Sequence, residues 1–332
     1  MSWRFSRRRF IGGLGATGLA ATIPTRLVAD PAPSYSPTDA SKSPFRVAVI
    51  TDEITQDFGR ALEIASKDFG LQWVELRGLW NKNLLKLDDK EISEARDLLQ
   101  RYKLRVTDIA SPLFKVDWPG APKSKFSPKS DQFGADFGSG QQDEVLERSV
   151  ELARVFNSDR VRCFDFWRLD DIPKYRDAIN ARLQEAAEKA ARKKVILVLE
   201  NEMTCNTATG KEAAATLAGI KSRNLMLNWD PGNAAMLGEK AFPDGYAALP
   251  KDRIGHCHCK DVQRKASGEG EEWAPVGGGI IDWVGQYKAL KRDGYHYAVS
   301  LETHWKGAGT PEASSRASMA GMQKALRQAS AL

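Results

Sequence analysis

Four side chains with the chemistry of metal ligands follow one another through the C-terminal half of the sequence. Each lies at or near the end of a short apolar run typical of a buried strand. They are Glu200, Asp230, His258 and Glu302. Three carboxylates and one imidazole that meet in one place would repel and desolvate one another unless a cation neutralised them. The pattern therefore predicts one divalent metal ion, and the mixed oxygen and nitrogen ligands favour Mn, Mg or Co without excluding Zn.

The segment around His258 also holds a second histidine and two cysteines, which together look like a zinc knot. The run reads Ile254-Gly255-His256-Cys257-His258-Cys259. Side chains alternate between the two faces of a strand, so the histidines point one way and the cysteines the other. We expect the cysteines to pack against outer helices as small apolar residues, and His256 to be a hydrogen-bonded core residue rather than a ligand. No disulfide is predicted among the four cysteines of the chain.

The elements that must position these side chains alternate regularly between short apolar runs and longer segments of helical period. Such alternation predicts βα units around a parallel sheet. The expected strands are 46–51, 73–77, 105–109, 160–164, 195–199, 225–229, 254–259 and 297–301. The expected helices are 58–67, 89–102, 143–156, 175–193, 211–221, 283–292 and 314–329. This α/β pattern favours a single closed (β/α)8 TIM barrel over an open doubly wound sheet.

The carboxyl ends of the strands form the active-site face of such a barrel. Alone, each of the four candidate ligands would be interpreted as a helix cap or a surface residue. Because they are spaced one per βα unit, we expect them to meet at this face and share one site.

Residues 114–142 interrupt the alternation with a long stretch rich in Gly, Pro, Ser, Lys and Asp. A loop of this length in a compact fold is often a lid or a binding loop. Its aromatic residues Trp118, Phe126, Phe133 and Phe137 could cover a pocket. The alternative is a surface insertion without such a role.

The first 29 residues carry five arginines and no acidic residue. Arg7-Arg8-Arg9-Phe10, followed by a short apolar stretch rich in Gly and Ala, resembles a twin-arginine export signal, and cleavage is expected near Ala29. We therefore expect a signal peptide at 1–29, a Pro- and Ser-rich linker at 30–44 and the barrel at 45–332. The expected location is the periplasm, reached through the twin-arginine translocation machinery. The alternative for this segment is a disordered basic tail.

The net charge of the chain lies almost entirely in that leader. Removing its five arginines from a net charge of +6 leaves +1. A nearly neutral body has no electrostatic reason to seek phosphate backbones, so we expect no nucleic-acid partner. The 332 residues suit one barrel of about 250 residues plus a leader. The sequence leaves a homo-oligomer open.

The motifs that contain the four ligands resemble those of the sugar phosphate isomerase/epimerase superfamily, also called xylose-isomerase-like TIM barrels. Their order and spacing fit throughout 195–305, and Thr51-Asp52-Glu53-Ile54 and Val74-Glu75-Leu76-Arg77 extend the likeness towards the N-terminus. The matching pieces are Leu199-Glu200-Asn201, Asp230-Pro231-Gly232-Asn233, His258-Cys259-Lys260-Asp261, Pro275-Val276-Gly277-Gly278-Gly279, Ile281-Asp282-Trp283, Gly294-Tyr295 and Ser300-Leu301-Glu302.

The resemblance implies a division of labour among the ligands. In members that resemble ketose 3-epimerases, two metal-binding glutamates also move the proton. Carried over, Glu200 and Glu302 would flank the substrate as acid and base, with the proton passing through a metal-stabilised enediolate. Asp230 and His258 would only anchor the metal. Arg264 matches a substrate-contacting arginine, and its alternative is a solvent-exposed loop charge.

Two positions depart from the epimerase pattern. Asn233 stands where those enzymes carry a histidine, and Asn206 stands where they carry a second substrate-binding glutamate. Asparagine can bind a hydroxyl but cannot exchange a proton near neutral pH. Together with these two asparagines, the candidate substrate-binding residues are Lys260, Arg264, Trp273 and Trp305, so the full set is Asn206, Asn233, Lys260, Arg264, Trp273 and Trp305. The tryptophans could stack on a sugar ring or simply pack at the rim, as could Trp167.

The sequence therefore leads to an isomerase or epimerase that acts on a small sugar or keto-sugar. The alternative on the same scaffold is a lyase or dehydratase acting on keto-sugars or keto-glycosides, because an enediolate beside a leaving group can eliminate. An apurinic endonuclease would need several metals and many histidines, and the chain has four histidines. A non-catalytic carbohydrate-binding barrel is the remaining alternative.

Overall fold

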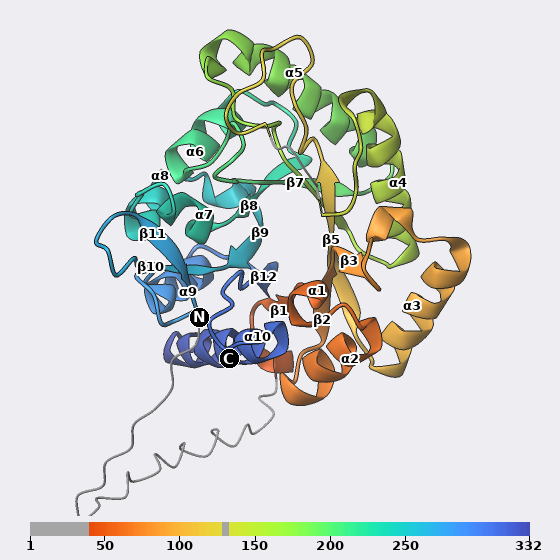
Figure 1. The fold of residues 1–332 in the computed structure, drawn as a ribbon, viewed down its shortest axis with the longest axis vertical. Coiled ribbons are helices and arrows are strands. Elements are labelled where there is room, and N and C mark those ends of the chain that lie inside the picture. The colour runs from red at the N-terminus through yellow and green to blue at the C-terminus, as the bar shows by residue number, and fades with distance from the viewer. Residues whose placement is uncertain (1–39, 128–132) are drawn as a thin grey trace, which may run out of the picture. The chain divides into compact units, whose positions relative to one another are not determined.

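The computed structural model describes residues 40–127 and 133–332. Eight parallel strands follow one another around a ring in the order in which they occur in the chain (Figure 1). The first and second strands close the ring through a parallel bridge between Ile50 and Glu75. The prediction of a single (β/α)8 TIM barrel is confirmed. The barrel strands are β1 (Arg46–Val49), β2 (Trp73–Leu76), β5 (Arg105–Leu113), β6 (Arg160–Cys163), β7 (Ile196–Glu200), β8 (Leu225–Trp229), β9 (Ile254–Cys259) and β12 (Ala298–Leu301).

Helices surround the ring on its outside (Figure 1). Several begin at the side-chain caps that their sequences contain: Asp88 and Glu91 form a capping box on α3, and Thr209 and Glu212 form one on α6. The helices are α1 (Thr51–Ile54), α2 (Phe58–Glu63), α3 (Asp89–Arg101), α4 (Gln142–Val155), α5 (Ile172–Ala191), α6 (Gly210–Ala218), α7 (Pro231–Ala235), α8 (Tyr246–Ala248), α9 (Trp283–Arg292) and α10 (Pro311–Gln328).

Short elements fill the connections. Two antiparallel hairpins stand outside the barrel sheet: β3 (Gly78–Leu79) with β4 (Lys82–Asn83), and β10 (Asp261–Arg264) with β11 (Glu271–Ala274). The remaining short turns are η1 (Ala40–Lys42), η2 (Ile64–Asp68), η3 (Leu84–Lys86), η4 (Ser139–Gln141), η5 (Ala241–Gly245) and η6 (Lys251–Arg253).

The apolar core lies between the strands and the outer helices. The strand β7 shows why its sequence does not alternate: Leu197, Val198 and Leu199 are all fully buried, since both faces of the strand are covered. Cys259 is fully buried too, and its sulfur accepts a hydrogen bond at 3.3 Å from the Tyr287 hydroxyl of α9. The expectation that this strand's cysteines face the outer helices is therefore confirmed, and all four cysteines are free.

The sequence-based boundaries differ most from the structure in two places. The helix expected at 58–67 ends its regular turns at Glu63 and continues as the wider turn η2. The strand expected at 105–109 runs on to Leu113, because residues beyond Ile109 pair with β6 after a shift in register. The periodicity of the sequence predicted neither the continuation of this strand beyond Ile109 nor the two hairpins.

The expected signal peptide at 1–29 lies outside the described residues, as does most of the linker expected at 30–44. Within the end of that linker, the Ser43 hydroxyl donates a hydrogen bond to the Ala331 carbonyl at 2.7 Å. Across 40–127 and 133–332, the helices are each too short or too polar to cross a membrane.

The packing of α10 against the loop after β11 depends on a glycine. A Cβ built on Gly321 would lie 1.8 Å from the Val276 carbonyl oxygen, so the two segments would have to separate. We expect Gly321→Ala to lower the free energy of unfolding by about 2 to 3 kcal/mol, as overpacking does. Urea denaturation measures this change in the free energy of unfolding. Gly140→Ala is the control, because nothing lies within 4 Å of a Cβ there. Equal stability of the two variants would contradict this packing.

Candidate metal centre

The four candidate ligands meet at the carboxyl ends of their strands. Glu200 ends β7, Asp230 follows β8, His258 lies on β9 and Glu302 follows β12. One donor atom from each lies within 4.8 Å of the others, and all four residues are buried. The ring nitrogen that faces the carboxylates is His258 Nδ1, which is 3.0 Å from Glu302 Oε2, 3.5 Å from Glu200 Oε1 and 3.7 Å from Asp230 Oδ2.

Hydrogen bonds between neighbouring strand ends hold Asp230 in this place. The Asn201 amide nitrogen donates to the Asp230 carbonyl at 2.8 Å, and the Asp230 N–H donates to the Asn201 side-chain oxygen at 2.8 Å. Asp230 Oδ1 caps α7 by accepting the Asn233 N–H at 2.9 Å. The first side-chain oxygen is thus engaged in the cap, and Oδ2 is left to face the other ligands.

The donor set fits a divalent cation. Asp230 Oδ2 and Glu302 Oε2 are buried, and neither accepts a well-directed hydrogen bond from any described residue. Buried carboxylate oxygens without such partners are costly unless a cation compensates them. Three carboxylates and one imidazole nitrogen match the ligands of Mn, Mg, Co or Zn sites.

Lys260 supplies part of the compensating charge. Its ammonium lies 2.8 Å from Asp230 Oδ2, 2.7 Å from Glu302 Oε2 and 3.6 Å from Glu200 Oε1. Burial opposes the charged form, but these carboxylates outweigh it and hold the pKa of Lys260 well above 10.5. Its chain passes close to α7, since a Cβ on Gly232 would lie 2.5 Å from Lys260 Cβ. Lys260 therefore contacts the ligands themselves, whereas the sequence placed it only among substrate-binding residues.

Two arginines that sequence reasoning did not assign to the site hold the two candidate catalytic glutamates. Arg162 Nη1 donates to Glu200 Oε2 at 3.1 Å, and Arg77 Nη1 donates to Glu302 Oε1 at 2.8 Å. Both arginines are buried. The available signal was a charged residue in or directly after an apolar strand, which has to point inward to a polar partner.

Several neighbouring cations determine the ionisation of the glutamates. For Glu200, burial raises the pKa, but His258 and Arg162 outweigh it, so the pKa lies below the ordinary 4.5. For Glu302, burial is likewise outweighed by Lys260 and His258, and its pKa lies well below 4.5. Both carboxylates are therefore ionised near neutral pH.

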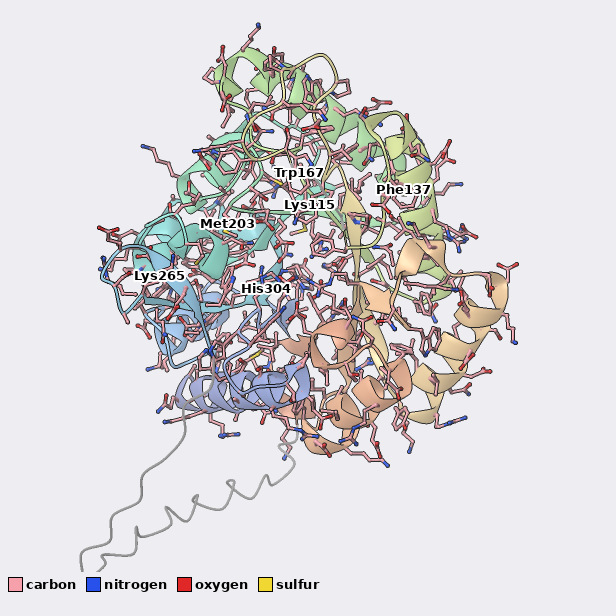
Figure 2. The ribbon with its side chains drawn as sticks, viewed as in Figure 1. Lys115, Phe137, Trp167, Met203, Lys265 and His304 are labelled. Carbon is pink, nitrogen blue, oxygen red and sulfur yellow. The ribbon has the colours of Figure 1, made fainter. Side chains whose placement is uncertain are left out.

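His304 is a third residue that sequence reasoning did not assign to the site. Its Nε2 lies 3.3 Å from Glu302 Oε1 and 3.5 Å from Glu53 Oε1. The ring meets Trp273 edge to face at 5.2 Å, and Trp273 also lies 5.6 Å from the Lys260 ammonium. Figure 2 shows His304 close to the middle of the ring of strands. Trp273 thus belongs to the surroundings of the ligands.

The other expected substrate-binding residues occupy different environments. Asn233 is buried beside the ligands, and its amide nitrogen donates to Glu200 Oε1 at 3.1 Å. Asn206 instead bonds to the backbone of 165–169. Its side-chain nitrogen donates to three carbonyls, with the shortest bond, 2.7 Å, to the Asp165 carbonyl, and its side-chain oxygen accepts the Leu169 N–H. Arg264 is exposed on the hairpin strand β10, opposite Glu271. Trp305 is half-buried, with its ring against Gly307.

Phe133 brings the long stretch 114–142 onto the site. Its ring lies 4.9 Å from the Arg77 guanidinium, 4.6 Å from the Lys115 ammonium and 5.3 Å from the Arg162 guanidinium. Lys115 pairs with Glu202 at 3.0 Å and lies beside Trp167, as Figure 2 shows. One aromatic ring therefore lies against cations that hold the glutamates.

Comparisons with known proteins agree with this architecture. The family described as "Xylose isomerase-like TIM barrel" matches residues 64–325. A search of curated proteins gave no match.

Among solved structures, the probable 3-DHS dehydratase AsbF from Bacillus anthracis is 20% identical with a TM-score of 0.64, over 84% of this chain and 98% of that chain. A xylose isomerase-like TIM barrel protein from Mycobacterium smegmatis, in complex with magnesium, is 17% identical with a TM-score of 0.61, over 88% and 99%. A D-allulose 3-epimerase from Methylomonas sp., in complex with D-allulose, is 19% identical with a TM-score of 0.60, over 86% and 97%. At these identities the likeness shows the fold.

Replacing one ligand tests the centre. Asp230→Asn keeps an oxygen to cap α7 but removes a negative ligand, so we expect Mn²⁺ affinity to fall by about 100-fold or more. Titration calorimetry and metal content after dialysis measure the change. Asp244→Asn, at an exposed position, is the matched control and should bind as the unaltered chain does. If the two variants hold equal metal, these four residues are not the ligands.

Proposed function

The chain belongs to the xylose isomerase-like TIM barrel family, and on that premise we propose that it is a divalent-metal-dependent isomerase or epimerase of a small sugar or keto-sugar. The observation that carries the proposal is the pair Glu200 and Glu302, two ionised carboxylates that reach one buried centre from different strands. One carboxylate of such a pair can take a proton from a carbon, and the other, once it is protonated, can return one to it.

The residues of the centre divide into metal ligands and candidates for proton transfer. Glu200, Asp230, His258 and Glu302 would hold the cation. When bound, that cation would polarise a carbonyl and a neighbouring hydroxyl of the substrate. One Asp230 oxygen caps α7, and the two ring nitrogens of His258 contact Glu75 and Glu302. Both side chains are thus fixed in place, which suits them to anchor the metal. Glu200 and Glu302 are the candidates for proton transfer.

The depressed pKa values restrict the kind of substrate. A carboxylate whose pKa lies below 4.5 is a weak base, because proton transfer is most efficient when the catalytic pKa is near the working pH. Glu200 and Glu302 could therefore remove only a proton that is already acidified. A carbon beside a carbonyl has such a proton. This favours a keto-sugar or the open-chain form of a sugar.

Residues around the glutamates can orient such a substrate. Lys260 and Asn233 offer donors beside Glu200. His304 lies beside Glu302, and the Trp273 ring lies beside His304 and Lys260. Aromatic faces bind the apolar face of a sugar ring, while the polar groups fix its hydroxyls. Phe133 would exclude water from above the cations.

A lyase or dehydratase is the second candidate, and the charge distribution favours it. Epimerisation needs a protonated group on the opposite face of the substrate, yet neighbouring cations lower the pKa values of both glutamates. Elimination needs only one base for the first step. The departures Asn206 and Asn233 also remove ionisable groups from the epimerase pattern. One of the solved structures with this fold is named a probable dehydratase.

The cellular setting of the proposal rests on the sequence alone. The arginine-rich leader supports export to the periplasm by the twin-arginine route, and the +1 charge of the remaining chain supports a small carbohydrate rather than nucleic acid as partner. A homo-oligomer stays open in this proposal.

Proton transfer is tested by NMR in deuterated water with the Mn²⁺-loaded chain and a panel of ketohexoses and keto-glycosides. Deuterium at one carbon without loss of a group indicates isomerisation, and loss of a group indicates a lyase. We expect Glu302→Gln to lower turnover by about 10² to 10⁴. Glu272→Gln, at an exposed hairpin position, is the control. If the chain binds metal and sugar but forms neither product, the proposal of an enzyme is wrong and a non-catalytic carbohydrate-binding barrel takes its place.

The pH dependence of activity tests the arginine contacts. Glu200 must be ionised to act as a base, so activity falls as pH drops through its pKa, which Arg162 helps to lower. Arg162→Met should move this acid limb to higher pH by about one to three units. Arg162→Lys keeps the charge and should leave the limb in place. An acid limb at the same pH in all three proteins would remove Arg162 from this role.

A further inference from the structure

A second group of buried side chains stands beside the metal ligands, and the proposed function does not use it. Glu75 of β2 lies inside the barrel and bridges two histidines of β9 with its two oxygens. Oε1 lies 3.0 Å from His258 Nε2, and Oε2 lies 3.0 Å from His256 Nε2. All three residues are fully buried.

The contact with Glu75 decides which face of His258 the ligands meet. A neutral histidine that donates one N–H to a carboxylate keeps its lone pair on the other ring nitrogen. A ligating His258 would be neutral, so with its Nε2–H donated to Glu75 the lone pair is on Nδ1, the nitrogen that lies 3.0 Å from Glu302 Oε2. The same contact fixes the rotation of the ring about its bond to Cβ, because the acceptor sits across the barrel on another strand.

His256 in turn restrains Glu75. It holds the second carboxylate oxygen, so the carboxylate cannot turn away from His258 without breaking that bond. The two imidazole rings stand at 86° to each other with centroids 5.3 Å apart. The other ring nitrogen of His256, Nδ1, has no hydrogen-bond partner among the described residues. Its directional contact is therefore with Glu75.

We infer that Glu75, restrained by His256, is a positioning residue that sets the tautomer and orientation of His258 and thereby the affinity of the centre for a divalent cation. A carboxylate behind a ligating histidine typically changes metal affinity by about 10- to 100-fold. The inference rests on the proposed metal centre. It gives a role to His256, which would otherwise be a polar core residue.

Cobalt is the probe, because its visible absorption reports ligand geometry directly. The full chain, Glu75→Gln and Asp108→Asn are titrated with Co²⁺, with calorimetry for affinity and absorption for geometry. Asp108 pairs with Glu75 in strand register and makes no hydrogen bond to a described residue, so it is the matched control. We expect Glu75→Gln to bind Co²⁺ about 10- to 100-fold more weakly with a shifted spectrum, and Asp108→Asn to change neither.

His256 provides a second pair of variants that decides the matter if Glu75→Gln does not fold. His256→Gln keeps an N–H donor for Glu75 Oε2, whereas His256→Leu does not. We expect weaker Co²⁺ binding in the leucine variant and recovery in the glutamine variant. Near-UV circular dichroism confirms that each titrated protein is folded.

The outcomes separate the inference from the proposal beneath it. If the unaltered chain binds no Co²⁺, the metal centre itself is wrong. If it binds Co²⁺ and the folded Glu75 and His256 variants bind equally well with the same spectrum, the positioning role is overturned and the centre stands. Two Co²⁺ ions per unaltered chain would make Glu75, His256 and His258 a second set of ligands, which also overturns it.

Discussion

The burial of several negative charges at the mouth of the barrel is the constraint on which the rest of this structure depends. Carboxylates from β7, β8 and β12 converge within a few ångströms and are almost completely removed from solvent. Buried like charges are tolerated only when cations and hydrogen bonds compensate them. The chain supplies that compensation from separate strands, with Arg77 after β2, Arg162 on β6, and His258 and Lys260 on and after β9. The polar interior is thus one connected network rather than four isolated ligands.

This network has a chemical consequence. The cations that make burial of these glutamates tolerable also lower their pKa values, with His258 and Arg162 acting on Glu200 and with Lys260 and His258 acting on Glu302. Ionised carboxylates suit metal ligation and the first removal of a proton. The same contacts work against a carboxylic acid that would return the proton. The balance between isomerisation and elimination therefore depends on side chains behind the glutamates as much as on the glutamates themselves. A ligand motif alone would not reveal this.

The barrel makes such a network possible because it brings distant strands to a common axis. Glu75 on the second strand reaches His256 and His258 on the seventh, and the ring closes where Glu75 bridges to Ile50. Loops then cover the rim: Phe133 lies over the cations on one side, and Trp273 lies beside Lys260 on the other. The site is therefore built from most of the strands, and its properties are not local to any of them.

The sequence by itself determined the eight barrel strands, the longer helices, the barrel and the convergence of four ligands, because those follow from local periodicity and from a rule about strand ends. It also predicted correctly that Cys257 and Cys259 turn away, since alternation along a strand is local. It could not show that Asn206 bonds to backbone, that Arg264 is exposed, or that Arg77, Arg162, Glu75 and His304 surround the ligands. Only the tertiary structure decided these partners. Pairing across a barrel depends on strand register and closure, which bring together side chains far apart in the sequence, and no local pattern encodes that distance.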